Sequence, residues 1–180
     1  MIDPSAMYRK IIPLTLEQAK ADISAAYIKG DMRLAGARCD ECPLGPKNPL
    51  RLERDLRRRP ILSELNFEAG VGLYGEAPGE TEEEEGNVFV GPSGQRAMSA
   101  LTKLGVRRGH VGWGNSAMCR PPKNELDKLE YKRAKVNKVR EKEGLPAIPS
   151  AHESCRPRYI REIAMYDNVI TFDVNWTRNV

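Results

Sequence analysis

Four cysteines constrain this chain of 180 residues more than any other feature of its sequence. Cys39 and Cys42 form a C-x-x-C pair, whereas Cys119 and Cys155 stand alone and far apart. A C-x-x-C loop presents two thiolates to one metal, and two distant cysteines complete a tetrahedral set only if the fold joins three segments. The spacing matches no compact zinc ribbon. Zinc, an iron-sulfur cluster and buried unliganded thiols therefore remain as alternatives.

The beginning of the chain favours neither export nor membrane insertion, because MIDPSAMYRK has no apolar stretch after its charged residues. We therefore expect a cytoplasmic protein, in which a reducing environment keeps thiols available for metal. With 40% hydrophobic residues, the chain is long enough for one domain, and we expect residues 1–180 to form it. A formal net charge of +4 permits a polyanionic partner but does not require one.

Capping signatures predict helices near both ends of the chain. Thr15 opens a capping box before a helix that ends at Gly30. Ser150 opens a second capping box before a helix that runs through Tyr166.

Two further helices are predicted in the middle of the chain. From Ser93, as N-cap, apolar residues recur at helical spacing as far as Gly105. Asn124 is expected to cap a long, highly charged helix that ends at Gly144 and has only a narrow apolar stripe. We expect this helix to protrude from the domain, as part of an insertion at about 124–150.

Three short runs predict strands, namely the glycine-flanked run from Val71, then HVGWGN, then NVITFDV. Because strands and helices alternate, the predicted class is α/β with a parallel sheet. Gly70, Gly72 and Gly75 satisfy G-x-G-x-x-G, but they lie within the first strand and Pro78 follows them. We therefore reject a dinucleotide-binding fingerprint.

The turn GEAPGE, directly after the first strand, exposes backbone N–H groups to a planar ligand. Phe89 offers a ring for stacking, although a core position is the simpler interpretation. Glu80 and the acids Glu82–Glu85 are interpreted as a solvated loop without a catalytic role. Asn115, taken alone, is a turn residue at the end of a strand.

Five motifs follow one another along the chain: C-x-x-C-P-L, GEAPGE after a strand, FVGPSGQ, N-x-x-x-C-R-P-P and C-R-P. In these motifs, over residues 39–172, the chain resembles the uracil-DNA glycosylase superfamily, specifically its iron-sulfur family 4 branch and related phage proteins. The resemblance implies a three-layer α/β/α sandwich with a short parallel sheet. It also implies that one 4Fe-4S cluster, with zinc as the alternative, is held by Cys39, Cys42, Cys119 and Cys155.

The resemblance further implies excision of uracil, or a related deaminated base, from DNA by N-glycosidic bond hydrolysis. A glycosylase takes its base out of the stack and reads the Watson-Crick edge. Gly75, Glu76 and Ala77 match the uracil and water site, Phe89 the stacking residue, and Asn115 the amide that pairs with O4 and N3–H. Glu76, Ala77 and Asn115 are the implied catalytic residues. An amide suits this task because it offers a donor and an acceptor side by side.

The chain departs from the family's pattern at three places. No H-P-S-type motif precedes Val180, and His110 and His152 lie in other contexts, so we expect a truncated chain or a second polypeptide that supplies the motif. A missing donor to the leaving group costs about 2.7–4 kcal/mol. Ala77 stands where other branches carry a water-activating aspartate. The segment from Cys119 to Cys155 is longer than usual.

The surplus in that segment is basic, since residues 119–162 contain twelve Lys and Arg against seven Asp and Glu. This excess of positive charge, like that of the run RLERDLRRR, is suited to binding the phosphate backbone of a nucleic acid. A solvated, salt-bridged helix is the alternative. For function, the alternatives to a glycosylase are a non-catalytic iron-sulfur module for DNA binding or protein interaction, and a zinc-bound structural domain. We expect a monomer.

Overall fold

The computed structural model of the chain describes residues 15–47, 49–50 and 59–172. The basic run RLERDLRRR lies outside the described residues, apart from Arg59. Within the described part of the chain, no helix combines the length and apolar character that crossing a lipid bilayer requires.

A three-stranded parallel sheet in the order β2-β1-β3 forms the centre of the fold. The central strand β1 (Val71–Gly75) pairs with β2 (Gly112–Asn115) on one side and with β3 (Asn168–Thr171) on the other. The predicted α/β class with a parallel sheet is confirmed. The register places Gly75 directly beside Asn115, so the ends of β1 and β2 meet at one edge of the sheet.

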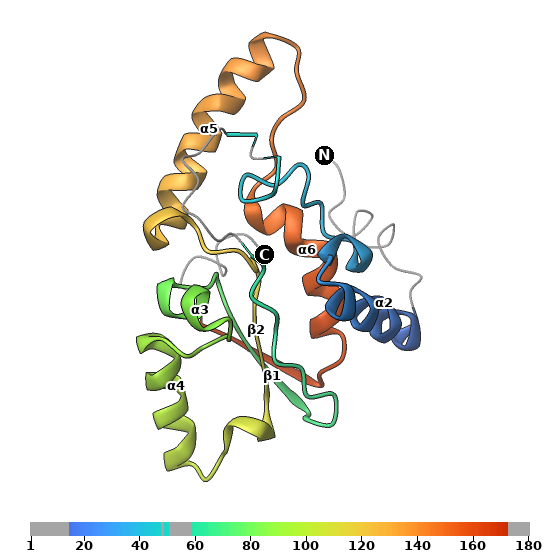
Figure 1. The fold of residues 1–180 in the computed structure, drawn as a ribbon, viewed down its shortest axis with the longest axis vertical. Helices are drawn as coiled ribbons and strands as arrows, with labels where there is room; N and C mark the ends of the chain where they lie inside the picture. The colour runs from blue at the N-terminus through green and yellow to red at the C-terminus, as the bar shows by residue number, and fades with distance from the viewer. Residues whose placement is uncertain (1–14, 48, 51–58, 173–180) are drawn as a thin grey trace, which may run out of the picture.

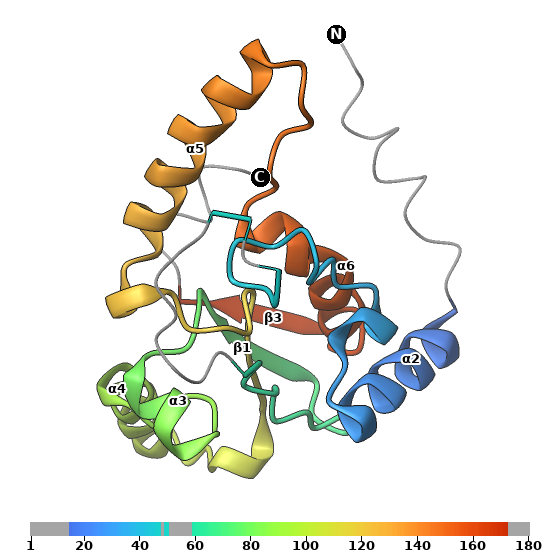
Figure 2. The same ribbon diagram turned by 45° about the horizontal axis from the view of Figure 1, so that its top comes forward.

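Helices cover both faces of this sheet, as the predicted three-layer sandwich requires (Figures 1 and 2). On one side lie α3 (Glu80–Glu85) and α4 (Pro92–Lys103). On the other side lie α2 (Leu16–Lys29) and α6 (Ala151–Ile163). Short 3-10 helices connect several of these elements.

Alternating residues of β1 supply the core on both faces, because successive side chains of a strand point in opposite directions. Leu73 packs with Trp113 and with apolar side chains of α4. Tyr74 packs on the other face, where its ring contacts Tyr159 and Tyr166 edge-on at 5.3 and 6.3 Å between ring centroids. The short strand is thereby buried on both sides.

The predicted capping box forms in full only at α6; at α2 the Gln18 side chain donates to Asp22 Oδ1 at 2.8 Å instead of reaching back to Thr15. Thr15 Oγ1 accepts a hydrogen bond from the first turn of α2, and Gly30 ends this helix in the left-handed conformation at φ +64°. Both hydrogen bonds of the Ser150 capping box are present in α6. This helix ends at Ile163 rather than at Tyr166, because the chain turns there and packs the Tyr166 ring beneath the sheet.

The segment before and within α4 differs from two predictions. The N-cap is Gly91 rather than Ser93, and Pro92 takes the first helical position, where its fixed φ fits and no N–H is needed. Gly105 follows the helix at φ +74°, as predicted. The predicted acidic loop is wrong, because Glu80–Glu85 form the short helix α3.

The charged helix α5 (Leu126–Lys142) protrudes from the rest of the molecule, as predicted (Figures 1 and 2). Asn124 does not cap it. Asn124 lies in a 3-10 turn at φ +61°, and Glu125 precedes the helix without a side-chain cap bond. The reason is Arg120, whose Nε–H donates to Asn124 Oδ1 at 2.6 Å and holds the amide away from the helix.

Candidate functional site

A pocket of about 530 Å³ opens at the carboxyl ends of β1 and β2. Parallel α/β sheets bind ligands at this edge, and the volume is typical of small-molecule sites. Its walls come from the GEAPGE turn, α3, the FVGPSGQ segment, the end of β2 and the beginning of α5. The lining residues are Gly75, Glu76, Ala77, Pro78, Gly79, Glu80, Thr81, Glu82, Phe89, Gly91, Pro92, Ser93, Gly94, Asn115, Pro121, Asn124, Leu126 and Phe172.

The five residues that the sequence assigned to substrate binding all line this pocket. Gly75 shows how closely they meet. A Cβ atom at Gly75 would lie 2.7 Å from Asn115 Oδ1 and 2.9 Å from Phe89 Cζ, which is closer than real Cβ contacts. Glycine is therefore required for the Asn115 amide and the Phe89 ring to share one space. Glu76 and Ala77 continue the wall directly after Gly75.

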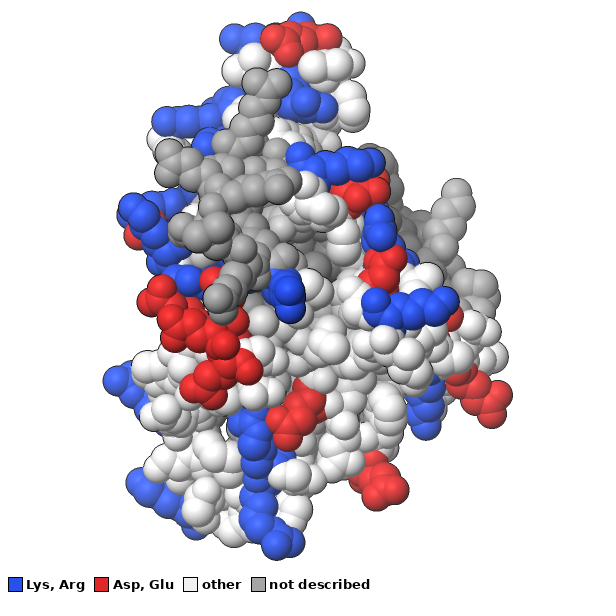
Figure 3. Space-filling model, in the orientation of Figure 1, with Lys and Arg blue, Asp and Glu red and all other residues white. Residues whose placement is uncertain are grey.

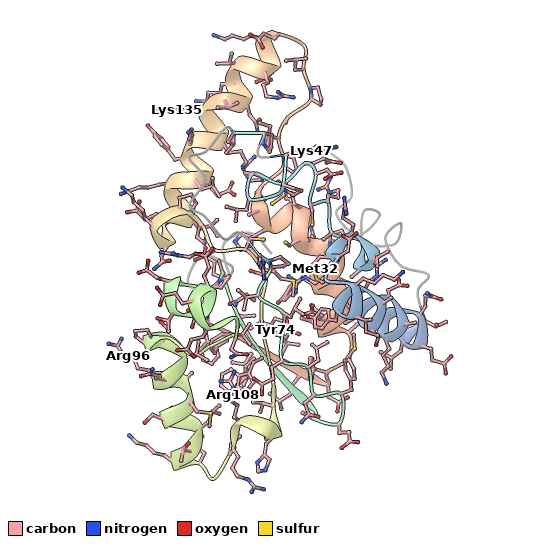
Figure 4. All side chains as sticks on the ribbon, viewed as in Figure 1. Met32, Lys47, Tyr74, Arg96, Arg108 and Lys135 are labelled. Atoms are coloured by element: carbon pink, nitrogen blue, oxygen red, sulfur yellow. The ribbon has the colours of Figure 1, made fainter. Side chains whose placement is uncertain are left out.

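The Phe89 backbone is held in an unusual conformation, with φ +55° in the left-handed region. Such strain persists only where surrounding contacts enforce it. Arg108, labelled in Figure 4, provides two of them, since its guanidinium donates to Val88 O at 2.6 Å and to Phe89 O at 3.4 Å. The ring lies 5.2 Å from the Trp113 ring and 5.9 Å from the Phe172 ring. Phe89 thus belongs to the core and to the pocket wall.

Asn115 is positioned through its backbone by Arg158 of α6. The Nη2 of this fully buried arginine donates to Asn115 O at 2.9 Å and to Ser116 O at 2.7 Å. Its Nη1 lies 2.9 Å from the buried Glu162 carboxylate. Burial acts to lower the pKa of Arg158, but the charge of Glu162 raises it above the ordinary value. The guanidinium therefore stays charged beneath the end of β2.

Glu162 is itself surrounded by hydroxyl groups from three other segments. It accepts hydrogen bonds from Tyr27 at 2.7 Å, from Ser63 at 2.7 Å and from Tyr74 at 3.2 Å. Burial, followed by the Glu162 charge, raises the pKa of Tyr27 and of Tyr74. The buried carboxylate thus joins α2, β1 and α6 beneath the pocket. In the sequence, only the i,i+4 spacing of Arg158 and Glu162 on a half-apolar helix hints at this pair.

Glu82, given no role from the sequence, joins two walls of the pocket. Its Oε2 accepts from Gly79 N–H at 3.0 Å, and its Oε1 accepts from Gly91 N–H at 2.7 Å. Arg120 binds two further carboxylates of α3, at 2.9 and 3.0 Å. Figure 3 shows these acidic side chains gathered over α3. The acidic segment therefore shapes the pocket rather than forming a solvated loop.

His152 lies nearer to the site than its sequence context suggested. Its Nε2 is 3.7 Å from Glu76 Oε1, and its Nδ1 is 3.0 Å from Ser116 Oγ. The Ser116 hydroxyl donates to Glu76 O at 2.9 Å, so it serves as acceptor toward a protonated Nδ1. The available signal was the position of His152 in the first turn of the helix that carries Cys155. His152 therefore contacts the Glu76 segment of the pocket wall both through Ser116 and beside the carboxylate.

The C-x-x-C loop is bound to the helix that carries Cys155. Arg38 N–H donates to Ser154 O at 2.8 Å and joins the loop to the first turn of α6. Within the loop, a Cβ at Gly45 would lie 1.7 Å from Cys39 O, so the loop closes only with glycine there. The spacing of the four cysteines indicated that the fold brings separate segments together, but it did not reveal these contacts.

The four thiols influence one another electrostatically. Burial, followed by the Cys155 sulfur, raises the pKa of Cys39 to about 11 and that of Cys42 to about 12. Burial also raises the pKa of Cys119, with Cys155, Cys42 and Cys39 as the next causes. Cys42 and Cys155 are buried and Cys39 and Cys119 are half-buried, and a positively charged group among them would stabilise their thiolates. Among the described residues, no group of three or more His, Cys, Asp and Glu side chains is placed to hold a metal ion.

The family model described as "Uracil DNA glycosylase superfamily" matches residues 62–172. A type-4 uracil-DNA glycosylase of Pyrobaculum aerophilum is 41% identical over 92 residues, which are 51% of this chain and 42% of that protein. The Thermotoga maritima protein of the same name is 32% identical over 97 residues, which are 54% of this chain and 46% of that protein. The chain therefore matches less than half of the length of these curated relatives.

The family match covers more than half of the chain and includes most of the pocket wall. It spans the strands, the GEAPGE turn, Phe89, Asn115 and two of the four cysteines. The α/β fold with its parallel sheet agrees with it. On this match, the chain belongs to the uracil-DNA glycosylase superfamily.

Proposed function

We propose that this chain excises uracil, or a related deaminated base, from DNA by hydrolysis of the N-glycosidic bond, as an enzyme of base excision repair. The meeting of Gly75, Phe89 and Asn115 in one pocket carries the proposal. Relatives named type-4 uracil-DNA glycosylases support it. The partner is DNA that contains uracil, and the place of action is the cytoplasm.

Recognition of the base rests on Phe89 and Asn115. The base leaves the stack, enters the pocket and lies against the Phe89 ring. The Asn115 amide then donates to uracil O4 and accepts from N3–H. Cytosine presents a donor at the position of O4, so it leaves the Asn115 N–H unpaired in a closed pocket. Such an unpaired group costs about 1–3 kcal/mol, which favours uracil.

Bond cleavage in this proposal is mainly electrostatic. As the bond breaks, negative charge spreads over the leaving uracil, and the Asn115 N–H at O4 stabilises it more strongly than in the ground state. Glu76 places a carboxylate where positive charge develops on the sugar, with His152 beside it. Ala77 has a side chain small enough to leave space for the attacking water next to Glu76.

Cys39, Cys42, Cys119 and Cys155 would hold the 4Fe-4S cluster that the resemblance implies. When bound, the cluster supplies covalent links between the C-x-x-C loop, the segment after β2 and the helix α6. Its expected contribution is structural, since it fastens the segment that follows Asn115. Iron and sulfide analysis of anaerobically prepared protein tests this, with about four irons per chain expected. Protein with one zinc per chain and no iron would contradict it.

The activity is tested with two single-stranded oligonucleotides that differ only in one central base, uracil or cytosine. The whole chain is incubated with each, and the released base is measured by mass spectrometry. We expect free uracil from the first oligonucleotide and no free base from the second. Binding of the uracil oligonucleotide without release of uracil would refute excision and favour the non-catalytic module. A second candidate, release that requires an added polypeptide, predicts activity only in the presence of a cell extract.

A further inference from the structure

Five lysines line one face of the protruding helix α5, and we call this set the lysine face. Their spacing of three or four residues places them on one side of the helix, and all five are exposed. Figure 4 shows Lys135 on the side of α5 turned away from the loop that returns toward α6. Figure 3 shows basic side chains along the outer edge of this helix. The lysine face consists of Lys128, Lys132, Lys135, Lys138 and Lys142.

The opposite face of α5 is packed, which fixes the direction of the lysine face. Leu126 and Leu129 are buried against the body of the protein. Further along the helix, Arg133 and Asn137 donate to Ile148 O at 3.0 and 2.9 Å. These contacts come from the returning loop and hold one side of the helix along most of its length.

Most positive charges of the lysine face are not neutralised by acidic neighbours, and Lys128 is the exception. Lys128 pairs with Glu125 at 2.6 Å. In the part of the chain that the structure describes, the other four lysines form no ion pair, although Lys135 Nζ lies 4.4 Å above the Tyr131 ring. Glu130 of α5 pairs with Arg133 rather than with a residue of the lysine face. Like charges one turn apart repel, so the lysine face destabilises the isolated helix.

We propose that the lysine face binds the phosphate backbone of duplex DNA next to the base-binding pocket. This inference rests on the proposed function, which supplies DNA as the ligand. Leu126, at the beginning of α5, lines the pocket, so the lysine face begins beside it. From Lys128 to Lys142 the helix rises about 21 Å, which runs alongside about twelve phosphate charges of a B-form duplex.

An anionic membrane is the other extended polyanion, and α5 fits it less well. Helices that lie on membranes insert an apolar face between lipids while basic residues flank it. The apolar face of α5 is already buried in the protein. Only Tyr131 and Val139 remain exposed on the outer side, and they are separated along the helix.

The test compares two triple variants with equal changes in net charge. One carries Lys132→Gln, Lys135→Gln and Lys138→Gln, and the control carries Lys20→Gln, Lys29→Gln and Lys103→Gln on α2 and α4. Fluorescence anisotropy measures binding to an undamaged DNA duplex over a series of salt concentrations. In the lysine-face variant we expect the slope of log K against log salt to decrease in magnitude by about 3. We expect binding at least about tenfold weaker in about 0.1 M salt.

The control should keep the wild-type slope, and arginine at the three lysine-face positions should restore it. Equal slopes in both triple variants would overturn the proposal. So would an unchanged DNA slope combined with lost binding to phosphatidylserine vesicles. Release of uracil from a short single-stranded oligonucleotide at saturating enzyme tests the proposed function separately. No release with the expected slopes refutes excision alone, whereas normal release with unchanged slopes refutes the lysine face alone.

Discussion

The pocket and the helix α5 lie side by side but are built on different principles. Each pocket group has one position, fixed by buried contacts from several segments, as Arg158 fixes the end of β2. The lysine face repeats one charge along an exposed helix, and no single lysine has a unique partner. Hydrogen bonds depend steeply on distance and angle, whereas exposed charges act together over about 8–10 Å. One substitution can therefore disable the pocket, whereas several are needed to disable α5.

The largest effect on stability is expected from Arg158→Met. Methionine leaves Glu162 buried without its ion-pair partner and removes the donor to Asn115 O and Ser116 O. Breaking a buried pair in this way costs about 3–5 kcal/mol. Urea unfolding measures the loss, and Arg158→Lys should lose less because the charge remains. If the free energy of unfolding of Arg158→Met lies within about 1 kcal/mol of the wild-type value, Arg158 does not hold the pocket as described.

A smaller loss of folding stability, about 2 kcal/mol, is expected from Glu82→Gln. The glutamine amide can accept through only one atom, so either Gly79 N–H or Gly91 N–H loses its acceptor. We expect a lower melting temperature and slower uracil release, because the two walls of the pocket separate. Glu84→Gln, on the exposed side of the same helix, is the matched control and should match the wild type.

In α5, a single substitution should affect the helix locally and leave the pocket unchanged. Asn137→Ala removes two hydrogen bonds to the backbone of Ile148, at 2.9 and 2.8 Å. We expect a loss of about 1 kcal/mol and faster amide hydrogen exchange in α5 alone. Unchanged exchange in α5 would contradict the stabilising contact, whereas faster exchange that spreads to β1 and β2 would show that the helix and the pocket form one cooperative unit.

The smallest effect is expected at the first turn of α6. The Ser150 backbone N–H lowers the pKa of Glu153 below its usual value, although burial opposes this. A carboxylate with a lowered pKa stabilises the fold above its unfolded pKa of about 4.3, and this stability is lost as pH falls through the folded pKa. Glu153→Gln should lose less than about 1 kcal/mol at neutral pH and nothing at low pH. A loss that is equal at both pH values would contradict the capping contact.

Local signals in the sequence predicted the local structure well. The N-cap at Thr15, the capping box at Ser150 and the three parallel strands are confirmed. The resemblance to the glycosylase superfamily, rather than a local pattern, implied that Gly75, Phe89 and Asn115 share one site, and all three line the pocket. The predicted caps at Ser93 and Asn124 are wrong, because Pro92 fits the first helical position and Arg120 holds the Asn124 amide.

The groups that support the pocket could not be predicted from the sequence. These groups are the charged residues Arg158, Glu162 and Glu82. A charged residue is buried only when other groups pair or hydrogen-bond with it. Apart from the Arg158–Glu162 pair within α6, their partners lie on other segments, such as Tyr27 and Gly91, and no local pattern reveals those contacts. The contact of His152 with Glu76 likewise depends on how α6 packs against the GEAPGE turn.

The central claim is that the Asn115 amide recognises uracil in this pocket, and single-turnover release of uracil by Asn115→Ala tests it most directly. Asn87→Ala, an exposed asparagine outside the pocket, is the matched control. We predict that kcat/KM falls about 5- to 150-fold in Asn115→Ala, because the Watson-Crick edge of the base loses its hydrogen-bond partner in the pocket. The kcat/KM of Asn87→Ala should equal that of the wild type. Circular dichroism should show that both variants fold. Release of uracil by folded Asn115→Ala at the wild-type rate would contradict the account.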